Sequence, residues 1–102
     1  MEVSWNTKDF TKWIANGCRV NDKVLEIKLD KSFTGEIPVQ IENITELLDF
    51  CVENANIKTI PKTIGNLKYL TNLKFIDIPN LSDIPKSIKY NLPSKSTIIL
   101  CK

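Results

Sequence analysis

Apolar residues recur along most of the chain in a pattern that repeats at a regular interval. The first set, Val24, Ile27 and Leu29, occupies offsets 1, 4 and 6 of a repeat. The same offsets hold Leu47, Phe50 and Val52 in the second repeat, and Leu70, Leu73 and Phe75 in the third. Because side chains alternate between the two sides of a strand, offsets 4 and 6 lie on one face. The pattern predicts one short strand per repeat, and the apolar residues 98–100 supply a fourth if the third repeat is one or two residues longer.

A second motif, Ile-Pro-x-x-Ile, follows each of the three apolar sets. It occupies residues 37–41, 60–64 and 84–88, so its spacing nearly matches that of the apolar sets. Proline fixes φ and donates no backbone hydrogen bond, so each copy marks a turn. The last isoleucine of each copy is expected to line a segment that returns across the other side of the molecule. Since one such unit cannot bury its apolar face alone, the units must stack into a continuous core.

This spacing, with a period of about 23–24 residues, resembles the leucine-rich repeat family over residues 24–101. Residues 60–67 are similar to the form common in cytosolic and microbial proteins, and residues 33–38 are similar to the plant-type form. The resemblance implies an α/β solenoid, a right-handed leucine-rich repeat with a short parallel sheet on its concave side. Offset 9, where the family usually has Asn, holds Ser32 and Ala55; we expect Asn54, Asn56 and Asn80 to substitute in part.

The chain is expected to form one domain, because 102 residues suffice for one core and are too few for two. Residues 1–23 are interpreted as an N-terminal helical cap, and residues 24–102 as repeats over 24–46, 47–69 and 70–93 with a partial terminal repeat at 94–102. The cap helix begins at Asn6 or Thr7, carries an apolar stripe and ends at Gly17. Trp5 and Trp13 are interpreted as side chains that close the end of the core.

Composition and charge narrow the class of protein. The chain is 42% apolar and 25% charged with a net charge of +2, values typical of a globular protein and too mild to require nucleic acid or a membrane as partner. No apolar run reaches the roughly 20 residues of a membrane span. The three cysteines are far apart and histidine is absent, so we expect free thiols, no metal and no cofactor. The absence of a signal-peptide pattern favours the cytoplasm.

Candidate catalytic groups are few. Cys51 is expected to face outward between Asp49 and Glu53, whose charges raise the pKa of a thiol and make it less reactive. Glu26 with Asp30, like Asp49 with Glu53, is a carboxylate pair of the kind that glycosidases use. A narrow sheet offers such a pair no deep cleft that excludes water. We therefore expect no enzymatic activity.

The outward positions of the predicted strands form the candidate binding surface. Rigid parallel strands present their side chains to a partner with little ordering cost. The resemblance implies that this concave face binds proteins, as a non-catalytic interaction module or scaffold, although the fold alone does not establish it. The predicted partner-binding residues are Glu26, Lys28, Asp30, Asp49, Cys51, Glu53, Asn72, Lys74 and Ile76.

Self-association is the alternative hypothesis. The last predicted strand contains Ile98, Ile99 and Leu100, and an apolar strand at the edge of a sheet leaves unpaired amide groups. We expect a second copy of the chain, as in a homodimer, or the terminal residues themselves to cover this edge.

Overall fold

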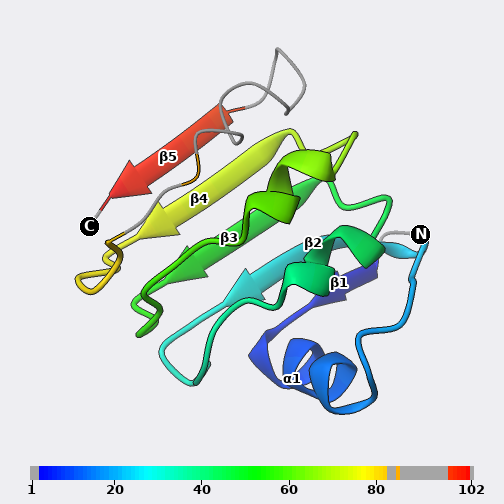
Figure 1. Cartoon of the computed structure of the whole chain (residues 1–102), viewed down its shortest axis with the longest axis horizontal. Coiled ribbons are helices and arrows are strands. Elements are labelled where there is room, and N and C mark those ends of the chain that lie inside the picture. Colours follow the sequence, from blue (N-terminus) through cyan, green and yellow to red (C-terminus); the bar gives the residue numbers. More distant parts are fainter. Residues whose placement is uncertain (1–2, 83–84, 86–96, 102) are drawn as a thin grey trace.

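The computed structural model describes residues 3–82, residue 85 and, as backbone, residues 97–101. Five strands form one sheet, and every neighbouring pair is parallel. The strands lie in chain order, from β1 to β5 (Figure 1). The chain is therefore an α/β protein with a parallel sheet. Its elements are β1 (Val3–Trp5), α1 (Thr7–Ala15), β2 (Val24–Leu29), the 3₁₀ helix η1 (Val39–Asn43), β3 (Asp49–Glu53), the 3₁₀ helix η2 (Lys62–Asn66), β4 (Asn72–Ile76) and β5 (Thr97–Cys101).

The strand register confirms the predicted period. Phe50 of β3 lies opposite Ile27 of β2 and opposite Leu73 of β4, so residues at the same offset of successive repeats are neighbours in the sheet. Between β4 and β5 the step along the chain is longer by two residues, with Leu73 opposite Ile98. The predicted longer third repeat is therefore confirmed.

Strand β1 was not predicted, because residues 1–23 were interpreted as a helical cap alone. Ser4 lies opposite Glu26 and Trp5 opposite Ile27, so the sheet begins before the helix. The strand has 3 residues, which are too few for an alternating pattern to be recognised in the sequence. The N-terminal segment thus supplies both a helix and the first edge strand.

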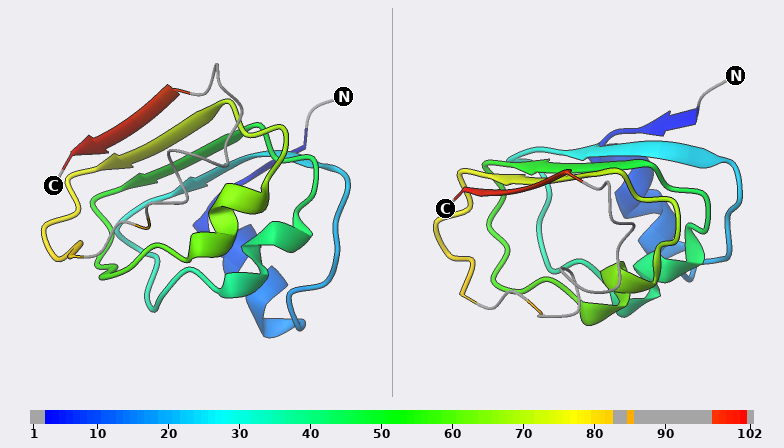
Figure 2. Two further views of the ribbon diagram at one scale, coloured as in Figure 1. Left: turned by 45° about the horizontal axis from the view of Figure 1, so that its top comes forward. Right: turned by 90° about the horizontal axis from the view of Figure 1, so that it is seen from above.

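After β2 and after β3 the chain crosses to a second layer, which contains η1 and η2, and then returns to the next strand (Figure 2). Pro38 and Pro61 have φ of −71° and −66° and immediately precede η1 and η2. Their carbonyl oxygens accept hydrogen bonds from the amides of Ile41 and Ile64, both at 3.1 Å. Those two isoleucines are fully buried beneath the sheet, and the Ile-Pro residues Ile37 and Ile60 are buried as well. Ile84, in the third copy of the motif, lies outside the described residues.

Helix α1 closes the first end of the core. Asn6 Oδ1 accepts the amide of Asp9 at 3.0 Å, and the Asp9 carboxylate accepts the amide of Asn6 at 3.2 Å, which is a capping box. Gly17, with φ of 97°, takes the left-handed conformation that follows the helix. The helix buries Phe10, whose ring lies 6.1 Å from that of Phe50. The predicted helix near the N-terminus is confirmed.

The turns after β3 and β4 depend on asparagine and aspartate. Asn54 and Asp77, the first residues after these strands, have φ of 61° and 54°. These two residue types tolerate the left-handed region better than most. Asn80 Nδ2 donates to Asn56 Oδ1 and so joins two successive turns. Asn56 and Asn80 thus link successive turns through their side chains, while Asn54 contributes a left-handed backbone conformation.

Candidate partner-binding surface

Alternate residues of β2, β3 and β4 point away from the core. In β3 and β4 the inward residues are buried, whereas the outward ones are half-buried or exposed. We call the outward set of these strands the outer sheet face, and it surrounds a shallow hollow of about 400 Å³. The outer sheet face consists of Glu26, Lys28, Asp49, Cys51, Glu53, Asn72, Lys74 and Ile76.

The register arranges these residues in three rows that cross the strands. The first row runs through Ser4, Glu26, Asp49 and Asn72. The middle row contains Lys28, Cys51 and Lys74, and the third row contains Glu53 and Ile76. Neighbouring strands lie about 4.8 Å apart and alternate residues of a strand about 6.7 Å apart, which sets the spacing within and between rows. The face is therefore acidic, basic and acidic in succession along the strands.

Hydrogen bonds hold the carboxylates of the first row. Ser4 Oγ donates to Glu26 Oε1 at 3.0 Å. Asn72 Nδ2 donates to Asp49 Oδ1. Each carboxylate thus accepts a hydrogen bond from the neighbouring strand. Sequence reasoning missed Ser4, because its strand was not expected; the Val3-Ser4-Trp5 alternation is the only signal that points to it.

The thiol of Cys51 lies at the centre of the outer sheet face. Burial raises the pKa of Cys51, and the negative charge of Glu53 raises it further, while Lys74 and Lys28 act in the opposite direction. The predicted direction agrees, but burial rather than the carboxylates is the main cause, and Asp49 is not among the groups that act on it. A thiol with a raised pKa is protonated at neutral pH and is a weak nucleophile.

Asp30 differs from the other predicted binding residues. It follows the end of β2, and its carboxylate accepts hydrogen bonds from Thr7 Oγ1 at 3.0 Å and from the Ser32 amide at 2.9 Å. The Ser32 side chain and amide, and then Thr7, lower the pKa of Asp30. The Asp30 amide in turn donates to Thr7 Oγ1 at 3.0 Å. Asp30 therefore joins the cap helix to the first repeat, and we do not include it in the outer sheet face.

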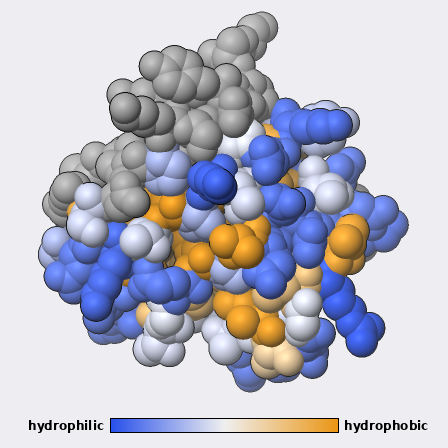
Figure 3. All heavy atoms as spheres, viewed as in Figure 1, coloured by the Kyte–Doolittle hydropathy of each residue, from blue (hydrophilic) through white to orange (hydrophobic). Residues whose placement is uncertain are grey.

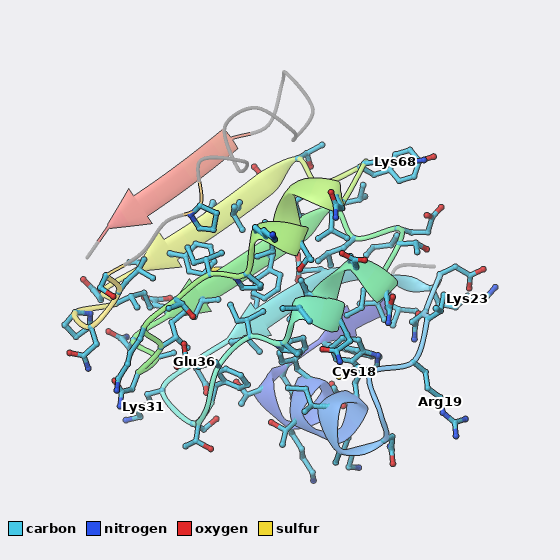
Figure 4. The ribbon with its side chains drawn as sticks, viewed as in Figure 1. Cys18, Arg19, Lys23, Lys31, Glu36 and Lys68 are labelled. Carbon is cyan, nitrogen blue, oxygen red and sulfur yellow. The ribbon has the colours of Figure 1, made fainter. Side chains whose placement is uncertain are left out.

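A second hollow, of about 590 Å³, lies at the cap beside Trp5, Trp13, Lys12 and Arg19. Trp13 is buried against Phe10, with ring centroids 5.4 Å apart, and its Nε1 donates to the Arg19 carbonyl at 2.8 Å. Trp5 lies 6.3 Å from Trp13. These contacts agree with the interpretation of both tryptophans as core-closing side chains. In Figure 4, Arg19 and Lys23 extend outward from the segment between α1 and β2.

The opposite side of the molecule has no comparable order of charges among its described residues. Figure 3 views the side of η1 and η2, where polar and apolar groups are interspersed. The large exposed apolar residues of the described chain, Val20, Val39 and Tyr69, are far apart in sequence and do not share an element. Isolated apolar side chains of this kind are normal on protein surfaces.

Comparisons of the sequence with protein-family models, with curated proteins and with solved structures give no significant match. Across the part of the chain that the structure describes, no helix has the length and apolar character needed to cross a bilayer. Within the same residues, no three cysteine or carboxylate side chains are grouped so as to hold a metal ion.

Proposed function

We propose that the chain is a short leucine-rich repeat module that binds a protein partner through its outer sheet face and has no catalytic activity. The constant register from β2 to β4, the parallel strand order and the recurring Pro–3₁₀ turn support a right-handed solenoid, since parallel crossovers are right-handed in nearly all proteins. The free thiols of Cys18 and Cys51 support a cytoplasmic location.

The observation that carries the binding proposal is the contrast between the two sides of the same strands. The inward residues of β3 and β4 fill the core, whereas the outward residues are mostly charged or polar and are half-buried or exposed. A row of such side chains on a rigid backbone presents a surface that needs little ordering when a partner binds. Asp49 and Glu53, at the two ends of β3, are the negative charges that the middle strand of this face carries.

The test is charge reversal on the outer sheet face. A partner is first isolated with the wild-type chain from its natural host, identified by mass spectrometry and purified. The double variant Asp49→Lys/Glu53→Lys should then lose its affinity for the purified partner while its melting temperature changes little. The control Asp22→Lys/Glu46→Lys makes the same change in net charge away from this face and should bind normally. Equal loss in both variants would refute the assignment of the surface.

Self-association is a second candidate, favoured by the position of β5. Among the strands that the structure describes, β5 is the last in the sheet, and β4 is the only strand paired with it. Its residues Ile98, Ile99 and Leu100 offer a backbone edge to which a strand from a second copy would add. Light scattering after size exclusion at micromolar concentration measures the assembly, and Ile99→Lys should dissociate it. A strict monomer at that concentration rules this candidate out.

A further inference from the structure

We propose that the partner supplies an extended segment whose alternate residues are basic, acidic and basic, and that this segment lies along β3. The inference rests on the proposed function, because it names the chemistry that the outer sheet face selects. It starts from the order of charge along the strands: carboxylates in the first row, two lysines in the middle row and a carboxylate in the third.

The spacing of the rows favours an extended segment that runs parallel to the strands. Alternate residues of an extended chain are about 6.7 Å apart, which is the separation of the rows, because both follow from the rise of a strand. A segment that crossed the strands would meet side chains about 4.8 Å apart, which matches neither one residue of an extended chain nor two. In a helix, residues i and i+4 are about 6 Å apart along the axis, so at the third row a helix falls short by roughly 1.4 Å and matches the spacing less closely than an extended segment.

Each row then defines one position of the segment. The first position lies beside Asp49 and Glu26, whose carboxylates Asn72 and Ser4 hold in place, and a basic side chain fits there. The second lies over Cys51 between Lys28 and Lys74, where an acidic side chain meets two positive charges. The third lies beside Glu53, with Ile76 next to it in the same row.

The third position has a further requirement. Lysine and arginine place their aliphatic stems on apolar surface while the charged end stays in water. A basic residue at this position therefore contacts Ile76 through its stem and Glu53 through its charge. Because the pattern is the same in both directions, the segment fits parallel or antiparallel to β3.

The test uses a library of random heptapeptides displayed on phage and selected against the immobilised chain. Peptides selected by the wild-type chain should carry Lys or Arg, then Asp or Glu, then Lys or Arg at alternate positions. Selection against Lys28→Glu/Lys74→Glu should change the middle residue from acidic to basic. The control Lys23→Glu/Lys68→Glu alters net charge equally at the strand-entry side and should leave the pattern unchanged. Circular dichroism confirms that each variant is folded.

Several results would overturn the inference. Charges spaced three or four residues apart would indicate a helical partner, and a middle residue that Lys28→Glu/Lys74→Glu does not change would remove the role of the middle row. The absence of any enriched sequence would show that a short segment is not what this face binds. In these three cases the proposed function still stands if the variant Asp49→Lys/Glu53→Lys no longer binds the purified folded partner.

A synthetic peptide of the enriched sequence distinguishes a failure of the inference from a failure of the proposed function. It should bind the wild-type chain about tenfold more tightly than it binds Asp49→Lys/Glu53→Lys, and binding should weaken as salt is added. Equal affinity for both chains would place the site elsewhere and would refute the proposed surface together with the inference.

Discussion

Phe50 and Cys51 are neighbours in β3, and they belong to two regions with different constraints. The Phe50 side chain is 1% exposed and its ring stacks 6.3 Å from that of Phe75, one repeat further along the chain. Cys51 lies between two lysines at the half-exposed surface. The inner side repeats the same kind of residue from strand to strand, whereas the outer side changes with each strand. The repeating side builds the fold, and the variable side is where a specific surface is able to arise.

The largest effect is expected when the inner side is truncated. Phe50→Ala removes a ring that packs against Phe10 and Phe75, and should lower the free energy of unfolding by about 3–5 kcal/mol. The adjacent Cys51→Ala should change it by less than about 0.5 kcal/mol. Denaturant titrations of both variants measure the contrast. Similar losses of unfolding free energy in the two variants would show that both sides of β3 contribute equally to stability.

The link between cap and first repeat should give the next largest effect. Thr7 is a buried polar residue, and its hydroxyl both donates to the Asp30 carboxylate and accepts the Asp30 amide. Thr7→Val leaves these groups without that partner and should cost about 1–3 kcal/mol. Thr7→Ser keeps the hydroxyl and should restore most of the stability. If serine were no better than valine, packing of the methyl group rather than hydrogen bonding would explain the loss.

Asp30 gives a smaller effect that depends on pH. Hydrogen bonds from Ser32 and Thr7 lower the pKa of its carboxyl in the folded chain, so folding favours the ionised form. The stabilisation is fully present above the unfolded pKa of about 3.9 and is lost as the pH falls through the lower folded pKa. The stability difference between wild type and Asp30→Asn should therefore shrink as the pH is lowered from 5 to 2. A difference that stayed constant over this range would contradict the assignment.

The sequence predicted the parallel strands because one physical requirement recurs in every repeat. Ile27, Phe50 and Leu73 must all meet the same core, so their even spacing along the chain reveals both the strands and their parallel register. The turns repeat for a related reason, since Pro38 and Pro61 each start a 3₁₀ helix. Strand β1 was not predicted, because Ser4 belongs to a very short segment whose pattern is not repeated elsewhere in the chain.

The surface was predicted less completely. Alternation along the strands places Lys28, Cys51 and Lys74 on the outside, and the structure brings them together in one row. Alternation does not reveal that the Asp30 carboxylate accepts a hydrogen bond from Thr7. That contact joins two distant parts of the chain through a hydroxyl group, which leaves no periodic signal in the sequence. Hydrogen bonding of polar side chains depends on the final geometry, which a pattern of apolar residues does not encode.

A small expected effect on stability tests the central claim, that the outer sheet face is not needed for folding. The measurement is the free energy of unfolding of Asp49→Lys/Glu53→Lys by denaturant titration. The account predicts a loss of about 1 kcal/mol or less, because the hydrogen bond from Asn72 to Asp49 is the main contact removed. A loss as large as that of Phe50→Ala would show that the outer carboxylates hold the fold together, and would contradict the separation between the side that stabilises the fold and the side proposed to bind.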